Sequence, residues 1–370
     1  MKVGIDVRPA VEEPAGIGKL TRNLVRYLLP LDPGIEYYLF SHLPLPPGMN
    51  GSNSHAIIHL VGQAGLPRVL WHARTAFDSR FRYRLDCMIS VGSLQVASLT
   101  DQHVILIIPD LSHVLFPQFH TNRSKLAGGL LMRRALKRAR KIVAISMHTR
   151  SDIIGYMAGA FNPDKVVVAP IGCDEVYQYP PSKARMADVR TRYALARYIL
   201  FVGTIEPRKN ILTLLHAFER VAATNSNIQL VLAGRLGWGY NDILSVSEKS
   251  RFCRQIKFIG FVPDDDMPAL YRMASVFVYP SLYEGFGIPV LEAMTCGTPV
   301  ITSNVSSMPE VVGEAGILLD PNNEKELAAA ITRVVSDSSL AQHLSDAGLE
   351  RSRTFSWKGF ASTILDVMRE

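Results

Sequence analysis

Cysteine is scarce in this sequence, and its four residues lie far apart, at Cys87, Cys173, Cys253 and Cys296. No two of them form a C-x-x-C pair. This spacing argues against a disulfide framework and against a structural zinc site. We therefore expect a protein of a reducing, cytoplasmic compartment.

Long hydrophobic runs, short-period repeats and low-complexity tracts are also missing. No apolar run approaches the ~18 residues that are needed to span a bilayer. The first residues, MKVGIDV, carry Asp6 where a signal peptide would be apolar. The sequence thus predicts neither a membrane span nor export by that route.

The 370 residues exceed what one hydrophobic core usually supports, so we expect two domains. Hydrophobic residues make up 48% of the chain and charged residues 20%, as in a globular rather than a disordered protein. The net charge of +7 favours anionic partners. It does not choose between phosphorylated metabolites, lipid head groups and nucleic acid.

Short apolar segments alternate with longer segments of helical period, which is typical of a parallel sheet covered by helices on both faces. The sequence therefore predicts an α/β fold. The expected strands lie at 2–7, 36–40, 56–61, 87–92, 104–108, 141–146, 166–170, 198–203, 228–234, 256–262, 275–280, 298–303 and 315–320.

A polar segment between Asp174 and Arg197 interrupts this alternation, which restarts at Tyr198. Such a lapse indicates a domain boundary. We expect two doubly wound, Rossmann-like domains at 1–175 and 176–355, and a C-terminal helix at 356–370 that returns to the first domain. Ligands of such sheets bind at the carboxyl ends of the strands, so motifs that follow strands are candidate sites.

The first of these motifs is GTIEPRKN, at 203–210, between a strand and a helical pattern. Arg208 and Lys209 reach the start of that helix, where the helix dipole favours anions. A guanidinium beside an ammonium is well suited to a diphosphate. The alternative is an ordinary solvated basic pair in a loop.

The second motif is YEGFGIPVLE, at 283–292. Its glycines precede a helix that we expect from about Pro289, and they allow backbone N–H groups to approach a phosphate or a sugar. Glu284 in the loop and Glu292 about one turn into the helix would accept hydrogen bonds from sugar hydroxyls. The alternatives are a helix cap for Glu284 and a charge that complements the helix dipole for Glu292.

Together these residues resemble a known family. EGFGIPVLEAMTCGTPV, at 284–300, is similar to the E-x7-E signature of the retaining glycosyltransferases of family 4, and GTIEPRKN is similar to the other donor motif of that family. Weaker matches are MKVGIDVRP, AGIGKLTRNL, DLSH, AISMHTRSDI and FSW. The resemblance implies the GT-B fold, in which two Rossmann-like domains face a central cleft.

The resemblance assigns roles to the two carboxylates and to the basic pair. Glu284 would contact the donor sugar at the catalytic centre, and Glu292 would hold the ribose of the nucleotide. Arg208 and Lys209 would bind the diphosphate as it leaves. Thr204 stands where many relatives have arginine, which shifts the phosphate contact onto Arg208.

The resemblance also extends the donor site to the base and to the opposite domain. Backbone near Phe261 and Val262 would meet the base, and a glycine turn at Gly16 and Gly18 would close over the phosphates. That turn fits neither a dinucleotide fingerprint nor a P-loop, and a plain helix start is its alternative. The complete set of expected donor-binding residues is Gly16, Gly18, Thr204, Arg208, Lys209, Phe261, Val262, Gly285, Phe286, Gly287 and Glu292.

The first domain departs from the family at one position. Relatives often carry His-Asp before the Leu-Ser that follows a strand, and the histidine lies near the donor sugar. This sequence has Pro109 before Asp110 instead, and His113 is the nearest histidine that could substitute. Asp110 and His113 are therefore the candidate catalytic residues of this domain.

The acidic run Asp264–Asp266 raises the question of a metal site. It directly precedes the helical stretch MPALYRMA, so capping of that helix explains it more simply. Arg208, Lys209 and helix ends can neutralise a leaving diphosphate without a metal. We expect no metal and no cofactor.

Two basic segments of the first domain, 68–84 and 123–141, are interleaved with apolar residues. As amphipathic helices they would lie on an anionic membrane or approach a lipid diphosphate, which would make the protein peripheral at the inner face of the plasma membrane. Packed helices with a solvated basic face are the alternative.

The sequence thus predicts a metal-independent, retaining hexosyltransferase that acts on a hydroxyl of a growing glycan in cell-surface polysaccharide synthesis. By resemblance the donor is GDP-mannose, with GDP-rhamnose and UDP-hexoses behind it. The two basic segments are the reason to expect an acceptor glycan that is carried on a lipid diphosphate. Two alternatives stay open: a nucleotide-sugar epimerase or hydrolase of the same two-domain fold, and a basic nucleic-acid-binding protein. Nothing resembles a nucleic-acid recognition module, so we expect no such partner.

Overall fold

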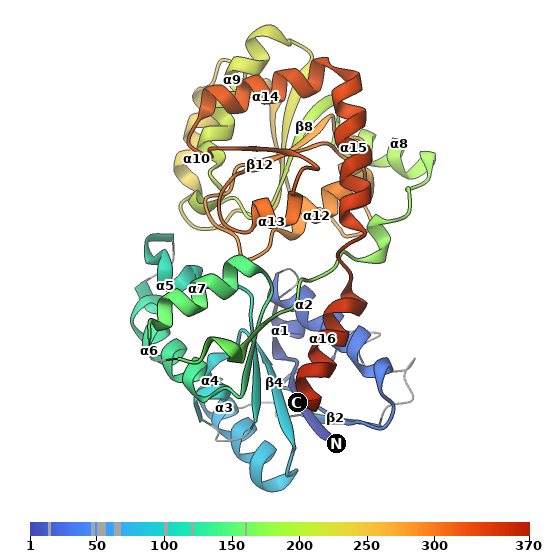
Figure 1. Ribbon diagram of the computed structural model, residues 1–370. Coiled ribbons are helices and arrows are strands. Elements are labelled where there is room, and N and C mark those ends of the chain that lie inside the picture. Colours follow the sequence, from blue (N-terminus) through green and yellow to red (C-terminus); the bar gives the residue numbers. More distant parts are fainter. Residues whose placement is uncertain are drawn as a thin grey trace. The chain divides into compact units, whose positions relative to one another are not determined.

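Two parallel sheets divide the chain into two units in the computed structural model, which describes residues 1–13, 16–45, 49, 57–62, 68–99, 103–119, 122–159 and 161–370 (Figure 1). Unit 1 contains Met1–Gly172 and Ser356–Glu370, and unit 2 contains Cys173–Phe355. The sequence placed these limits at 175 and 355.

The sheet of unit 1 has seven parallel strands in the order β3-β2-β1-β4-β5-β6-β7. The chain therefore runs outward from β1 in one direction and then in the other, as in a doubly wound fold. The strands are β1 (Lys2–Asp6), β2 (Glu36–Ser41), β3 (Ile57–Gly62), β4 (Cys87–Val91), β5 (Val104–Ile108), β6 (Lys141–Ala144) and β7 (Val166–Val168).

Helices follow these strands and pack on a sheet whose central strands, β4 and β5, are buried along their whole length. This burial explains their near-continuous apolar sequences. The helices of unit 1 are α1 (Arg8–Glu12), α2 (Ile17–Leu28), α3 (Arg68–Phe77), α4 (Leu94–Leu99), α5 (Ser112–Leu115), α6 (Asn122–Arg138), α7 (Met147–Met157) and α16 (Trp357–Arg369).

The C-terminal helix α16 packs against α2 of unit 1 (Figure 1). Trp357 and Phe360 are buried and make an edge-on ring contact with centroids 5.8 Å apart. The chain enters α16 next to Gly172, where a side-chain carbon would lie 2.2 Å from the backbone nitrogen of Trp357. At its far end Arg369 pairs with Asp32 at 2.8 Å.

The sheet of unit 2 has six parallel strands in the order β10-β9-β8-β11-β12-β13. Its strands are β8 (Arg197–Val202), β9 (Ile228–Ala233), β10 (Ile256–Gly260), β11 (Val276–Tyr279), β12 (Val300–Ser303) and β13 (Ile317–Leu319). Its helices are α8 (Lys183–Arg192), α9 (Ile211–Thr224), α10 (Tyr240–Lys249), α11 (Met267–Arg272), α12 (Ile288–Thr295), α13 (Met308–Val312), α14 (Glu324–Ser336) and α15 (Ser338–Ser352).

The predicted α/β fold with two doubly wound, Rossmann-like domains is confirmed. Each expected strand is present within the part of the chain that the structure describes, and most end a residue or more before the expected limit. The strands stop earlier because the last residues of the expected ranges, among them Gly203, Gly234 and Pro280, already belong to the turns that follow the strands.

The acidic run Asp264–Asp266 was expected to cap α11, and its last residue, Asp266, is at the N-cap position but makes no side-chain cap hydrogen bond. Its backbone is helical (φ −89°, ψ −24°) rather than extended, so the carboxylate does not turn back to the helix N–H groups. The carboxylate is fully buried and pairs with Arg185 at 2.8 Å and with Arg192 at 2.6 Å, both from α8. A buried carboxylate needs such counter-charges, and here they join α8 to α11.

Glycines bring together the carboxyl ends of β8, β9 and β10 in unit 2. The backbone N–H of Gly234 donates to the carbonyl of Gly260 at 2.8 Å, and that of Gly203 donates to the carbonyl of Ala233 at 2.9 Å. A side-chain carbon on Gly234 would lie 1.9 Å from the carbonyl oxygen of Gly203. The loops that follow these three strands are therefore in direct backbone contact.

Replacing Gly234 with alanine is expected to destabilise unit 2. The residue has φ +147° and the new carbon would overlap backbone, which cannot move aside as a flexible side chain can. We expect the free energy of unfolding, measured by urea denaturation, to fall by roughly 2–4 kcal/mol. Gly260→Ala is the matched control, because Gly260 has φ +69° with no atom within 4 Å, and it should cost only about 1 kcal/mol. Equal losses would contradict the close packing.

Candidate functional site

The candidate site lies at the topological switch point of the sheet in unit 2. β8 has β9 on one side and β11 on the other, so the loops that follow β8 and β11 leave the sheet next to each other. Ligands of doubly wound sheets bind at this position, outside the carboxyl ends of the strands. The two motifs of the sequence, 203–210 and 283–292, follow these two strands.

The loop after β8 presents the basic pair on a short 3-10 turn, Pro207–Lys209. Pro207 opens the turn, and Asn210, in the left-handed conformation (φ 56°), leads into α9. Arg208 donates to the carbonyl of Tyr283 at 2.6 Å, and its own carbonyl accepts from the N–H of Leu282 at 3.0 Å. The two motif loops are thus hydrogen-bonded to each other.

Six side chains of these loops and of β11 form an ionic cluster, defined as Glu206, Arg208, Lys209, Tyr279, Ser281 and Glu284. One carboxylate oxygen of Glu284, Oε1, accepts from the Lys209 ammonium, from Ser281 at 2.6 Å and from Tyr279 at 3.0 Å. Its other oxygen lies 3.2 Å from Nη1 of Arg208. Glu206 pairs with Nη2 of Arg208 at 2.9 Å.

The protonation of the cluster follows from burial and from the paired charges. Burial alone would raise the pKa of Glu284, but the charges of Arg208 and Lys209 and the hydrogen bonds outweigh it and lower the pKa from 4.5 to about 2. Burial lowers the pKa of Lys209, and the charge of Arg208 adds to this effect, whereas Glu284 opposes it. The carboxylate is therefore ionised at neutral pH and holds two cations.

Tyr279 joins the cluster to the core of the sheet. Its ring stacks on Phe201 of β8 and on Phe277, with centroids 5.6 Å and 5.8 Å apart. Its hydroxyl accepts from the Lys209 ammonium at 2.7 Å and donates to Glu284. Sequence reasoning missed this residue, although a tyrosine inside a buried strand indicates a hydroxyl that needs a partner.

Two further loops support the cluster. Ser306, after β12, accepts from the N–H of Glu284 at 2.8 Å, and Ser307 donates to the carbonyl of the same residue at 3.0 Å. Gly287, with φ 100°, is the N-cap of α12, and a side-chain carbon there would lie 2.4 Å from Cε of Met308. The backbone of this loop is therefore held on both sides.

Glu292 lies in α12 and is buried, with 5% of its surface exposed. Its Oε2 accepts from the hydroxyl of Tyr271, in α11, at 3.0 Å. Burial, followed by the charge of Glu292, raises the pKa of Tyr271 well above 10, so this tyrosine remains a hydrogen-bond donor. Glu292 thus has its own buried partner, apart from the cations that hold Glu284.

The other donor-site residues predicted in unit 2 have different surroundings. Phe286 is buried and packs edge-on against Phe355, with ring centroids 5.5 Å apart, so its side chain belongs to the core. Thr204 is exposed, Val262 is buried, and Phe261 is 51% exposed. Gly285 lies between Glu284 and Phe286 in the loop before α12.

The predicted residues of unit 1 follow its own strands. Gly16, with φ 55°, is the N-cap of α2, and no atom lies within 4 Å of where its side chain would begin. Gly18 is packed: a side-chain carbon there would lie 1.8 Å from the carbonyl oxygen of Glu13. Pro14 and Ala15, in the same turn, lie outside the described residues.

Asp110 and His113 follow β5. Asp110 accepts from the N–H of Ser112 at 2.8 Å and from its hydroxyl at 2.7 Å, which fixes the entry to α5. His113 is half-buried within α5. The structure therefore places both residues at the carboxyl end of a strand in unit 1, in line with a ligand-binding edge.

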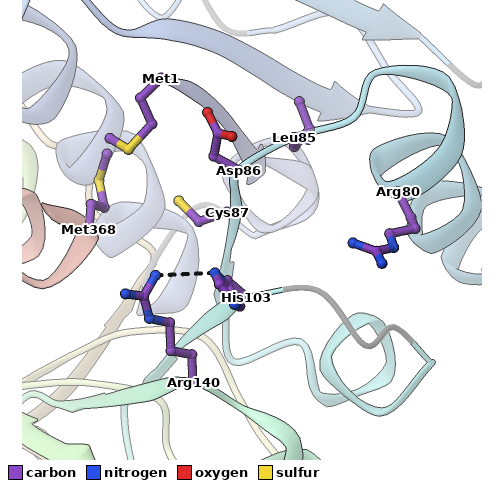
Figure 2. A pocket seen from close by; sticks show the side chains of 8 residues that line it. All are labelled: Met1, Arg80, Leu85, Asp86, Cys87, His103, Arg140 and Met368. Carbon is purple, nitrogen blue, oxygen red and sulfur yellow. Dashed lines mark hydrogen bonds between the residues drawn. The ribbon is translucent and has the colours of Figure 1, made fainter. Parts of the chain in front are cut away.

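A cavity of about 450 Å³ lies at the opposite edge of the unit 1 sheet, near the start of β4 (Figure 2). Its polar wall includes Arg80, Arg140 and His103, and Arg140 lies 3.2 Å from Nδ1 of His103. Helices of a parallel α/β unit end at this edge, where basic side chains complement their carbonyl groups. We assign the cavity no role in the site.

Within the described part of the chain, no three histidine, cysteine, aspartate or glutamate side chains are grouped so that they could hold a metal ion. The same residues contain no helix that is long and apolar enough to cross a membrane.

Comparison with known proteins matches residues 188–351, which include the whole ionic cluster, to the family described as Glycosyl transferases group 1. The O-antigen chain mannosyltransferase B of Escherichia coli is 35% identical over 271 residues, which are 72% of this chain and 70% of that protein. The chain belongs to the group 1 glycosyltransferases. The predicted family is thereby confirmed, and the protein is an enzyme of this family.

A second relative and a solved structure add to this comparison, the first on the family and the second on the fold of this group 1 glycosyltransferase. The serotype-specific mannosyltransferase WbdA of Escherichia coli is 33% identical over 234 residues, which are 62% of this chain but only 29% of that protein. The crystal structure of HepE from Anabaena in complex with UDP-glucose has a TM-score of 0.79 at 16% identity and covers 100% of this chain and 99% of its own. This structural likeness bears on the fold alone, which is the predicted GT-B fold.

Tyr279→Phe is expected to change the pH dependence of this glycosyltransferase. The Lys209 ammonium would lose an acceptor, which lowers the pKa of a group that burial already lowers. The alkaline limb of the pH–rate profile should therefore move to lower pH. Tyr198→Phe is the matched control, because Tyr198 is also buried but donates to the carbonyl of Leu270. An unmoved limb in Tyr279→Phe would contradict the proton coupling of Tyr279 to Lys209.

Proposed function

We propose that this glycosyltransferase moves mannose from GDP-mannose to a hydroxyl of a growing glycan in cell-surface polysaccharide synthesis, with retention of anomeric configuration. The observation that carries the proposal is the ionic cluster, in which Arg208 and Lys209 meet at the start of α9. The relatives named mannosyltransferases support the choice of sugar. HepE, a protein with a similar fold, is in complex with UDP-glucose in its crystal structure. The choice of guanine or uracil as the base of the donor nucleotide therefore needs a direct test.

The leaving diphosphate is the group that the cluster would stabilise. In the cluster, two cations pair with the carboxylates of Glu206 and Glu284. A bound diphosphate would form ion pairs with the same two cations. Arg208 would offer a planar fork to the phosphate oxygens and Lys209 a point charge. Stabilising the departing diphosphate in this way needs no metal.

Glu284 would act on the sugar through the oxygen that has fewer donors. Its Oε1 accepts from three donors, whereas its Oε2 has Arg208 at 3.2 Å. A sugar hydroxyl would therefore approach Oε2, next to the same arginine that meets the diphosphate. The acceptor oxygen would bond to the anomeric carbon on the face from which the bond to the diphosphate breaks, and its proton would pass to the departing diphosphate oxygen, so that configuration is retained.

Other residues have supporting roles in this proposal. Glu292, oriented by Tyr271, would accept from the ribose hydroxyls. In unit 1, Gly16 has open space around it and would offer backbone N–H groups to a ligand, whereas Gly18 is required by its packing on Glu13. Asp110 and His113, at the carboxyl edge of unit 1, would face the acceptor.

The acceptor glycan would be carried on a lipid diphosphate at the inner face of the membrane. In the first basic segment, Phe77 and Phe81 are 59% and 64% exposed, and their rings lie 5.0 Å apart. Arg80 and Arg82, in the π-helical turn Asp78–Arg82, are exposed as well. Exposed aromatic rings among arginines are the surface that an anionic bilayer attracts.

The function is tested by transfer of mannose from labelled GDP-mannose to a panel of alkyl hexosides, with UDP-glucose as the alternative donor. Glu284→Gln removes the charge but keeps the shape, so we expect kcat to fall by roughly 10²–10³ while GDP still binds, because both cations remain. Glu248→Gln, an exposed carboxylate of α10, is the control. Near-normal transfer by Glu284→Gln would overturn the role of Glu284, and hydrolysis of the donor without any transfer would overturn the proposed reaction.

Membrane contact is tested separately by flotation. Wild-type protein should float with vesicles that contain phosphatidylglycerol and not with phosphatidylcholine alone. The double variant Arg80→Glu/Phe81→Ser should bind at least roughly tenfold more weakly, since each basic residue near an anionic surface contributes about 1 kcal/mol. Arg254→Glu, an exposed residue of unit 2, should have no such effect. Equal flotation with both vesicle types would remove the membrane from the proposal.

A further inference from the structure

The cavity near the start of β4 lies at the edge of the unit 1 sheet where the strands begin. Cys87 is the first residue of β4, His103 directly precedes β5, and Arg140 directly precedes β6. The substrates of doubly wound sheets bind at the other edge, outside the carboxyl ends of the strands. A ligand of this cavity would therefore be additional to the sugar donor and to the acceptor.

Three basic side chains from three separate loops line the cavity. Figure 2 shows Arg140 and Arg80 on the two sides of His103. Nη1 of Arg140 lies 3.2 Å from Nδ1 of His103. Because a guanidinium has donors only, Nδ1 is the acceptor of this bond and the ring N–H is on Nε2. All three side chains therefore have N–H groups that can donate to a bound ligand.

The helix ends at this edge have basic partners of their own. The carbonyl of Ser98, in α4, accepts from Arg134 at 3.1 Å. The carbonyl of Ala139, after α6, accepts from Lys165 at 3.1 Å. Satisfying these helix carbonyls therefore does not require the side chain of Arg140, which is turned to His103 instead.

The charges of the cavity lining do not balance. Its one carboxylate is Asp86, whose Oδ2 accepts from the backbone N–H of Lys2 at 2.7 Å. Among the residues that the structure describes, Arg80 and Arg140 form no ion pair with a carboxylate. Two permanent positive charges thus face one negative charge, with the imidazole of His103 as a further donor. This arrangement favours an anion.

The remaining lining is apolar and held in place. Leu85, Cys87 and Met368 are 6%, 2% and 4% exposed. Burial raises the pKa of the Cys87 thiol to about 12, so this side chain stays neutral. Met368 belongs to α16, and two residues further on the carboxylate of Glu370 pairs with Lys141 at the start of β6. The cavity therefore combines a fixed apolar wall with basic groups.

We propose that this cavity binds an organic phosphate monoester, with its phosphate on Arg80, His103 and Arg140 and its organic part on Leu85 and Met368. A monoester has three terminal oxygens, which match donors that come from three loops, and arginine is well suited to phosphate. The volume of about 450 Å³ is that of a small-molecule site and exceeds what a phosphate group alone would fill. This inference does not depend on the proposed function.

The test is titration calorimetry at constant ionic strength with hexyl phosphate, inorganic phosphate and hexyl methyl phosphate, a diester. Wild-type protein should bind hexyl phosphate saturably. It should bind inorganic phosphate more weakly, by about fourfold for each methylene that the apolar wall buries. The diester has one charge and one terminal oxygen fewer, so it should bind roughly tenfold more weakly. Absence of saturable binding of hexyl phosphate would overturn the proposal.

Variants assign the binding to the cavity. Arg140→Gln, and separately Arg80→Gln, should weaken binding of hexyl phosphate roughly 10- to 100-fold, because each removes charged hydrogen bonds. Met368→Ala should weaken binding of hexyl phosphate but not of inorganic phosphate. Arg254→Gln is the matched control, because Arg254 is an exposed arginine that precedes β10 at the amino edge of the other sheet. Wild-type affinity in both Arg140→Gln and Arg80→Gln, or an equal loss in Arg254→Gln, would overturn the site.

Flotation distinguishes the two sources of such a ligand, because a free metabolite and the head group of phosphatidic acid are both phosphate monoesters. Phosphatidylglycerol is an anionic lipid with a diester, so it is the control lipid. If the ligand is a head group, wild-type protein should float better with phosphatidic acid than with phosphatidylglycerol, and Arg140→Gln should remove this difference. If hexyl phosphate binds but the two lipids give equal flotation, the cavity serves a free phosphate monoester.

Discussion

The buried pairing of Glu284 with Lys209 and Arg208 is the interaction on which the site depends. Burying these charges separately would be costly, because each loses its hydration. When the three charges are buried together, each has an ion-pair partner, and Tyr279 and Ser281 add hydrogen bonds to them. The carboxylate is the common partner of both cations, so it determines where a diphosphate would find positive charge.

The parallel sheet supplies the position of this pairing. β8 and β11 are neighbours in space although the chain forms β9 and β10 between them, so two loops far apart in sequence leave the sheet side by side. On the other side of β8, glycine contacts join the loops after β9 and β10 to the loop after β8. The carboxyl edge of the unit 2 sheet therefore carries Arg208 and Lys209 after β8. It also carries Arg235 and Phe261 after β9 and β10, and the Arg235 guanidinium carbon lies 4.8 Å from the Phe261 ring centroid.

Individual residues show which features of the site could be predicted from the sequence. Arg208, Lys209 and Glu284 were predicted from their places after strands, and the structure brings these three together. The acidic run before α11 was expected to cap that helix, but the carboxylate of Asp266 pairs instead with two arginines of α8. The side chain of Phe286, a predicted donor-site residue, packs on Phe355 in the core, which its sequence neighbours did not indicate. These differences arise from contacts between residues that are distant along the chain.

The sequence by itself determined the α/β class, the order of strands and helices, and the family, because these follow from local hydrophobic period and from short motifs. Only the tertiary structure decided which side chains share a charge and which residues face solvent. The hydrogen bonds of Tyr279 to Lys209, the ion pairs of Asp266 and the stacking of Arg235 on Phe261 join different strands and helices. Such contacts depend on how the sheet orders its strands, which no local pattern encodes.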